Sequence, residues 1–257
     1  ILGGGQNLIP YQDDVLLNLV TCALVIFGGI GFLVIREVIA KRFRWKKLSM
    51  HAKVVLFMSL VLTAAGTVLL KLTEDITWMG AFFTSVSART AGFSTFPLGS
   101  FSSAGLLTVI VLMVIGASPG STGGGIKTTT CYVLFEGIRS SATNTSEKAF
   151  RYAVPADAFR KAAVITLLAI GIVLSGTYIL VILEPGVPFL DALFEMSSAF
   201  GTAGLSTGIS AGLCDAAKIL TILIMFIGRL GPLTIASLWY FTKGERVSYP
   251  EGNIAIG

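Results

Sequence analysis

Long apolar stretches separated by short polar connections run through this 257-residue chain. Residues 15–35 and 162–183 each reach the length of about 20 residues that a helix needs to span a bilayer. Residues 54–70 come close to that length, whereas residues 106–115 and 219–227 are shorter. We therefore predict five spanning helices, of which the third and the fifth are broken by glycine-rich segments.

Composition and charge support a membrane protein. Hydrophobic residues make up 54% of the chain and charged residues only 13%, which is far from the balance of a soluble domain. The net charge of +5 is concentrated in two connections and so does not indicate nucleic-acid binding. His51 is the sole histidine, and the three cysteines share no metal-ligand spacing, so the sequence predicts no metal-dependent or triad enzyme.

The distribution of charge sets the expected topology. Basic residues crowd two connections, and acidic residues occupy the alternate ones. The basic residues are Arg36, Lys41, Arg42, Arg44, Lys46, Lys47 and Lys53, then Arg139, Lys148, Arg151, Arg160 and Lys161. The acidic residues are Asp13, Asp14, Glu74, Asp75, Glu184, Asp191 and Asp215. The positive-inside rule places the basic connections in the cytoplasm and the acidic ones outside.

Two apolar segments are too short to cross the membrane. Residues 78–87 and 189–200 each follow an outer acidic turn, and we expect them to be re-entrant helices that enter from the outer interface. Each then leads through an extended turn into a helix that returns to the cytoplasm. The expected unit is therefore a helix, a re-entrant pore helix, a turn and a second, broken helix.

The extended turns carry a duplicated motif. SVSARTAGFST at residues 85–95 reappears as SSAFGTAGLST at residues 197–207, so that Gly204 follows Gly92 by 112 residues. Irregular backbone at membrane depth is tolerated where protein buries it or where it lines a watery path. A central glycine allows successive carbonyl oxygens to face one axis, and such carbonyls replace the hydration shell of a cation. We expect a cation-selective filter made by Thr90, Ala91, Gly92, Phe93, Thr202, Ala203, Gly204 and Leu205.

The repeat suggests how the chain is organised. Residues 48–150 form one complete unit and residues 151–257 another, whereas residues 1–47 resemble the end of an earlier unit. An axial pore of this kind usually needs four units, so we expect one and a half units to lie outside this chain. The predicted fold is an all-α integral membrane protein with repeated helix–pore-helix–helix units around a pore, as in potassium channels.

A glycine-rich run interrupts the returning helix of the first complete unit. Helix-breaking and polar residues gather there, namely Gly116, Ser118, Pro119, Gly120, Gly123, Gly124, Gly125 and Lys127. We expect this run to be a gate below the filter. In the second unit, Arg229 lies beside the matching break and is expected to favour the closed gate. The run also resembles a phosphate-binding loop, but Ile126 interrupts that pattern and no strand precedes it.

Arg89 stands directly before the first filter turn, where an unpaired charge would be costly. We expect its side chain to point away from the pore axis, with Glu195 of the second pore helix as a candidate partner. Phe93 and Leu205 are expected to pack outward and brace their turns.

Taken together, these motifs resemble the Trk/Ktr/HKT superfamily of potassium transporters, and in particular its KtrB-type and NtpJ-type bacterial members. The similarity covers essentially the whole chain and includes GASPGSTGGGIKT and FIGRLGPLT. It implies four units around one pore, with Gly92 and Gly204 in the third and fourth, the loop at residues 116–127 as the gate, and Arg229 as the gating arginine.

The resemblance also implies partners and a location. Such proteins are homodimers in the bacterial plasma membrane that sit on a cytoplasmic ring of nucleotide-binding regulatory subunits. K⁺ is the expected substrate, with the role of Na⁺ left open and no organic cofactor in this chain. Two alternatives remain open, a non-conducting membrane subunit and a secondary transporter with broken helices at a midplane site.

Overall fold

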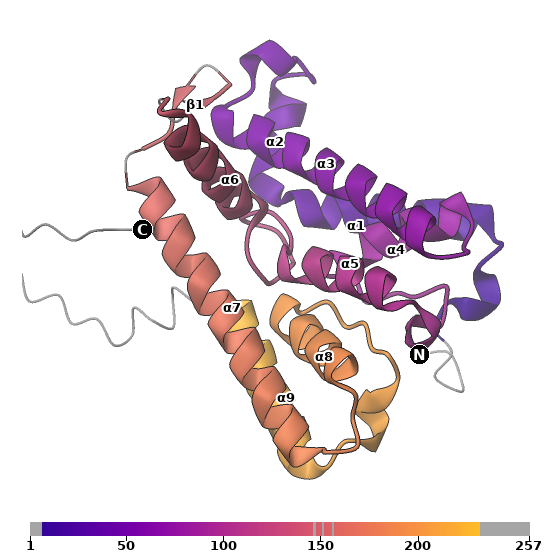
Figure 1. Cartoon of the computed structure of the whole chain (residues 1–257). Helices are drawn as coiled ribbons and strands as arrows, with labels where there is room; N and C mark the ends of the chain where they lie inside the picture. Colours follow the sequence, from indigo (N-terminus) through magenta and orange to yellow (C-terminus); the bar gives the residue numbers. More distant parts are fainter. Residues whose placement is uncertain (1–6, 146–147, 151, 156, 232–257) are drawn as a thin grey trace, which may run out of the picture.

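The computed structural model describes residues 7–145, 148–150, 152–155 and 157–231, and these residues are mainly helical (Figure 1). The α-helices are α1 Val15–Ile30, α2 Phe32–Ala40, α3 Met50–Thr73, α4 Trp78–Ala88, α5 Ser103–Val114, α6 Thr128–Thr143, α7 Ala158–Leu183, α8 Phe189–Gly201 and α9 Asp215–Leu230. A hairpin pairs β1 Lys148–Ala149 with β2 Tyr152–Ala153, and short 3₁₀ turns are η1 Ile9–Tyr11, η2 Trp45–Lys47, η3 Leu98–Ser100 and η4 Ile209–Gly212.

Among the described residues, two helices are long and apolar enough to cross a membrane without interruption. These are α3 and α7, with 24 and 26 residues. The helices α5 and α9 are shorter, with 12 and 16 residues, and α5 ends where the glycine-rich run begins. The described residues therefore confirm the break in the third expected span. The part of the fifth expected span that follows residue 231 lies outside the described residues.

The first expected span is also broken, contrary to the prediction of one continuous apolar stretch. Helices α1 and α2 meet at Gly31 with a bend of 95°. Gly31 has a φ of +90°, a backbone conformation that side-chain-bearing residues rarely adopt. The amide of Phe32 donates to the carbonyl of Gly120 at 3.2 Å, so the glycine-rich run supplies a partner at the break.

The two complete units have the same order of elements. In the first, α4 packs against α3 and α5, and in the second, α8 packs against α7 and α9. The units meet where α5 lies along α8 (Figure 1). The apolar cluster at this contact contains buried Val109 and Met113 from α5 and buried Phe194 from α8. Burial of these side chains positions α4 and α8 and the turns that follow them.

In each unit an acidic residue joins the end of the first helix to the start of the returning helix. Glu74 follows α3, and its Oε1 accepts hydrogen bonds from the amide of Ser102 at 3.0 Å and from its hydroxyl at 2.6 Å. Glu184 follows α7, and its Oε1 accepts from the amide of Cys214 at 2.6 Å. Both carboxylates thus satisfy amides at the start of the returning helix. These acids, expected at the outer face, have a structural role in each unit.

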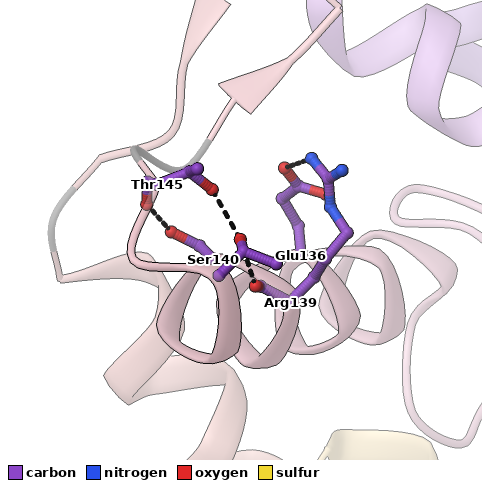
Figure 2. A network of polar contacts seen from close by, with 5 residues as sticks. Glu136, Arg139, Ser140 and Thr145 are labelled. Atoms are coloured by element: carbon purple, nitrogen blue, oxygen red, sulfur yellow. Dashed lines mark hydrogen bonds and ion pairs between the residues drawn. The ribbon is translucent and has the colours of Figure 1, made fainter.

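The end of α6 is fixed by a polar network (Figure 2). Arg139 donates from Nε and Nη2 to the two carboxylate oxygens of buried Glu136, at 3.0 and 2.6 Å. Asn144 ends the helix in the left-handed conformation, and the amide of Thr145 donates to the carbonyl of Ser140 at 3.1 Å. The helix that follows the glycine-rich run therefore has a defined end.

Candidate functional site

The duplicated TAG motifs form two turns of similar backbone shape. We call residues 90–93 the first TAG turn and residues 202–205 the second. Helix α8 ends directly before the second turn, and α4 ends one residue before the first, with Arg89 between them. Both turns begin with a threonine at positive φ, +78° for Thr90 and +51° for Thr202. The central glycines also have positive φ, +78° for Gly92 and +81° for Gly204. This conformation explains why glycine recurs at the centre of each turn.

The two turns lie against each other. A Cβ atom placed on Gly92 would lie only 2.7 Å from the carbonyl oxygen of Ala203. A Cβ atom on Gly204 would lie 3.5 Å from the Cα of Gly92, which is an ordinary contact. The structure thus brings together the two predicted filter segments, which are 112 residues apart in the sequence. Gly92 is the more tightly restricted of the two glycines.

The first TAG turn is braced from two directions. The hydroxyl of Ser87, in the last turn of α4, donates to the carbonyl of Phe93. The side-chain amide of Asn7 donates to the carbonyl of Gly92 at 3.0 Å, and the amide of Leu8 donates to the carbonyl of Ser94 at 3.0 Å. Sequence reasoning missed Asn7, because no local motif marks a contact across 85 residues.

The second TAG turn is braced by Glu195 from α8. Its side chain is buried, and its Oε1 accepts from the hydroxyl of Ser206 at 2.5 Å and from the amide of Thr207 at 3.1 Å. Its Oε2 accepts from the hydroxyl of Ser210 at 2.7 Å. The carboxylate thus ties α8 to the segment that leaves the turn.

Glu195 is not the partner of Arg89, so that expectation was wrong. Arg89 is buried, and its Nη2 donates to the hydroxyl of Thr63 on α3 at 2.9 Å. Its Nε has no hydrogen-bond partner among the described residues. The guanidinium is therefore directed to the long helix of its own unit, while the Glu195 carboxylate is occupied within the second unit.

The residues that follow the two central glycines differ in their packing. Leu205 is buried and belongs to the apolar cluster between α5 and α8, as expected for a bracing residue. Phe93 remains 39% exposed and lines a cavity of about 240 Å³ beside Gly28, Gly29 and Thr122. This cavity lies between the first TAG turn, α1 and the glycine-rich run.

The glycine-rich run at residues 116–127, which we call the glycine-rich loop, lies directly against both TAG turns. The amide of Gly124 donates to the hydroxyl of Thr202 at 3.0 Å. A Cβ atom on Gly123 would collide with the side chain of Thr90, and one on Gly124 would collide with that of Thr202. Small residues at these two positions are therefore required for the close approach.

The loop is also tied to the broken ends of α1 and α2. The amide of Ser118 donates to the carbonyl of Gly29 at 3.1 Å. A Cβ atom on Gly31 would lie 2.7 Å from the carbonyl oxygen of Pro119. At the two ends of the loop, Ile115 and Ile126 form a parallel bridge. The loop therefore begins and ends at nearly the same point in the fold.

Two basic side chains hold the loop. Lys127 donates from Nζ to the carbonyl of Gly123 at 2.6 Å. Arg229, one residue before the end of α9, donates from Nη1 to the carbonyl of Thr122. The structure thus brings Arg229 to the loop across 107 residues. Gly231 ends α9 with φ +89° and ψ +138°, close to the values of +90° and +141° at Gly31, so the two breaks have the same backbone geometry.

Comparisons with known proteins match this architecture. Residues 48–242 match a family model described as TrkH, cation transport protein. The chain belongs to this family of cation transporters, which are not enzymes. It is 36% identical to the Ktr system potassium uptake protein B of Bacillus subtilis, over 98% of this chain and 59% of the relative. It is 32% identical to the potassium/sodium uptake protein NtpJ of Enterococcus hirae, over 98% of this chain and 60% of the relative.

A solved structure supports the fold independently. The potassium transporter TrkH from Vibrio parahaemolyticus superposes with a TM-score of 0.71 at 20% identity, over 87% of this chain and 52% of that one. The chain therefore has the fold of the matching part of that transporter. It spans about three-fifths of the length of the curated relatives it matches.

Proposed function

We propose that this chain supplies two neighbouring units of a potassium-conducting pore in a multi-pass protein of the bacterial plasma membrane. The observation that carries the proposal is the direct contact between the two TAG turns, each centred on a positive-φ glycine. Backbone carbonyls of Thr90, Gly92, Thr202 and Gly204 would replace part of the hydration shell of K⁺. The names of the relatives, which are potassium uptake proteins, support the choice of ion.

The glycine-rich loop is proposed as the gate of this path. It contacts both TAG turns, and hydrogen bonds join it to the broken ends of α1 and α2, to Thr202 and to Arg229. Arg229 holds the loop at Thr122, so its charge and its hydrogen bond both favour a closed arrangement. Opening requires that these contacts be released while α5 and α6 keep their places.

The assembly and its regulation follow from the family resemblance. We propose a homodimer whose cytoplasmic face binds a ring of nucleotide-binding regulatory subunits. Residues 1–47, 48–150 and 151–257 would then be the end of the second unit, the third unit and the fourth unit. The name of the Enterococcus hirae relative includes sodium as well as potassium, which supports a test for sodium dependence in this protein.

Substitution of the two glycines tests the filter directly. In the native membrane assembly, Gly92→Ser and Gly204→Ser should lower the apparent potassium affinity and weaken discrimination against sodium. A side chain at positive φ costs roughly 1–3 kcal/mol, so an effect of about tenfold is expected. The effect of Gly92→Ser should be the larger, because its Cβ would also meet the carbonyl of Ala203.

Potassium uptake by a strain that lacks its own uptake systems is the measurement, at limiting K⁺ with and without added Na⁺. Gly186→Ser is the matched control, since a Cβ atom there meets nothing within 4 Å. Wild-type potassium affinity and sodium competition in both variants, at normal expression, would remove the filter assignment.

A further inference from the structure

A basic and aromatic cavity lies at the end of α3 that is far from the TAG turns. It has a volume of about 610 Å³ and is lined by Trp45, Lys46, Lys53, Phe150 and Tyr152. These residues come from the 3₁₀ turn η2, the first turn of α3 and the hairpin around β1 and β2. Figure 1 shows the hairpin beside the start of α3 and the end of α6. By the charge pattern, this is the cytoplasmic end of the molecule.

Lys53 is the residue that points to a ligand. Its residue surface is only 9% exposed, yet no acidic side chain pairs with its ammonium group among the described residues. Its Nζ lies 5.9 Å from the centre of the Tyr152 ring, which supplies a cation–π contact, and no described residue accepts a hydrogen bond from it. A largely buried ammonium that opens into a cavity favours an anionic ligand there.

The aromatic residues show which kind of anion fits. The ring of Phe150 contacts Trp45 at 6.1 Å and Phe57 at 6.3 Å between ring centres, both edge to face. Phe57 lies one helical turn further into the membrane-spanning helix α3 than Lys53 and is 43% exposed. An apolar surface thus extends from the cavity along the outer side of a spanning helix. An acyl chain would pack against this surface, whereas a soluble anion would not.

We propose that this cavity binds the phosphodiester headgroup of an anionic phospholipid from the cytoplasmic leaflet. Lys53 and Lys46 would donate to the phosphate oxygens, and the acyl chains would lie against Phe57 and Phe150. Charge-assisted hydrogen bonds to phosphate and aromatic residues at the membrane interface are both typical of such sites. The site adjoins the connection between α2 and α3 and does not depend on whether the TAG turns conduct ions.

Fluorescence quenching tests the proposal in the native membrane assembly. The other two tryptophans of this sequence are replaced by Trp78→Phe and Trp239→Phe, and any tryptophan elsewhere in the assembly is replaced likewise, so that Trp45 alone reports on the cavity. The protein is reconstituted in phosphatidylcholine vesicles that contain increasing amounts of brominated phosphatidylglycerol. We expect saturable quenching at low mole fraction, which brominated phosphatidylcholine does not reproduce.

Two lysine variants separate a built site from diffuse attraction. Lys53→Gln should weaken quenching by more than about tenfold, the value of a hydrogen bond to a charged group. Lys47→Gln removes the same charge from the neighbouring 3₁₀ turn, but Lys47 does not line the cavity. Its effect should not exceed about fivefold and should fade in high salt, as expected for diffuse attraction. Lys53→Arg keeps the positive charge and should keep most of the binding. It therefore shows whether the loss in Lys53→Gln comes from the missing charge or from a folding defect.

Three results would overturn the proposal. Equal quenching by the two brominated lipids would show ordinary contact with the bilayer. If Lys53→Gln and Lys47→Gln weaken the quenching equally, at both salt concentrations, the lipid is attracted by surface charge alone. Relief of the quenching by millimolar inorganic phosphate or ATP would assign the cavity to a soluble phosphate compound instead.

Discussion

At the residue scale, Glu195 offers a test of how the second TAG turn is held. Its carboxylate accepts three hydrogen bonds, from Ser206, Thr207 and Ser210. Glu195→Ala would leave these partly buried donors without their charged partner, at a cost of about 1–3 kcal/mol. We expect a lower unfolding temperature together with a lower apparent potassium affinity.

Ser210→Ala is the graded control for this prediction. It removes one hydrogen bond to the carboxylate and the contact with the Ser206 hydroxyl, but it keeps the carboxylate and its other two donors. Its effects should be smaller on both measurements. A Glu195→Ala protein that unfolds earlier but takes up potassium with unchanged affinity would show that Glu195 supports the fold and not the turn.

Single residues were predictable where the chemistry is local. Gly92 and Gly204 could be identified from the sequence because a positive φ favours glycine and the motif is duplicated. The partner of Arg89 could not be identified from the sequence. It is the hydroxyl of Thr63, 26 residues away on a helix, and no sequence pattern marks such a contact. Asn7 and its contact with Gly92 were missed for the same reason.

At the element scale, two helix breaks meet at the glycine-rich loop, and only one of them could be predicted from the sequence. The break between α5 and α6 was predicted, because Pro119 and its surrounding glycines cannot continue a helix. The break at Gly31 was not, because the stretch around it is uniformly apolar and resembles one span. That bend depends on hydrogen bonds to a distant loop, which hydropathy does not encode.

Shortening the loop should open the path. The amide of Thr128 lies 3.4 Å from the carbonyl of Ala117, so deletion of residues 118–124 need not pull α5 and α6 apart. The deletion removes the contacts with Thr202, Gly29 and Arg229 together. The closed state would lose contacts worth roughly 1 kcal/mol or more. We therefore expect potassium flux to rise several-fold and to depend less on a regulatory partner.

Rubidium uptake by reconstituted vesicles measures this change, with thermal unfolding as the control for folding. If the shortened protein folds normally and its flux and regulation match the wild type, the loop is a structural connection only.

Acid should weaken the link between α7 and α9. The hydrogen bond from the Cys214 amide holds the pKa of Glu184 below its ordinary value. A carboxylate whose pKa is lowered by folding stabilises the fold above its unfolded pKa, and this contribution is lost as the pH falls through the folded pKa. Wild-type protein should therefore lose thermal stability in that acidic range, and Glu184→Gln should lose less.

The comparison uses unfolding temperatures of both proteins from neutral pH down to the acidic range. Asp215→Asn is the matched control, since Asp215 is exposed at the start of the same helix and accepts no such bond from Cys214. Identical acid profiles for wild type and Glu184→Gln would contradict the link.

At the scale of the whole molecule, the duplicated units could be predicted from the constant offset of their motifs, but their mutual placement could not. The structure sets α5 of one unit along α8 of the other, and so brings the two TAG turns into contact. The same arrangement brings α9 of the second unit to the loop of the first, through Arg229 and Thr122. The proposed gate would thus be shared between units.

This sharing makes a prediction about coupling. Arg229→Ala removes a positive charge and the donor to Thr122, so potassium flux should rise, whereas Arg229→Lys keeps the charge without the planar fork and should be intermediate. In a chain that already lacks residues 118–124, the same Arg229→Ala substitution should change flux little. The coupling between contacting sites is commonly about 0.5–3 kcal/mol, which corresponds to a readily measured difference in flux.

Lys218→Ala is the control for charge alone, because Lys218 lies on the same helix near Asp215 at the opposite end from the loop. It should leave flux unchanged in both backgrounds. If Arg229→Ala raises flux equally with and without the loop, the arginine acts on the ion by its charge, and the loop and α9 do not operate as one gate. If flux stays at the wild-type level or falls, Arg229 is a packing residue, because a residue that favours the closed state can only release flux when it is lost.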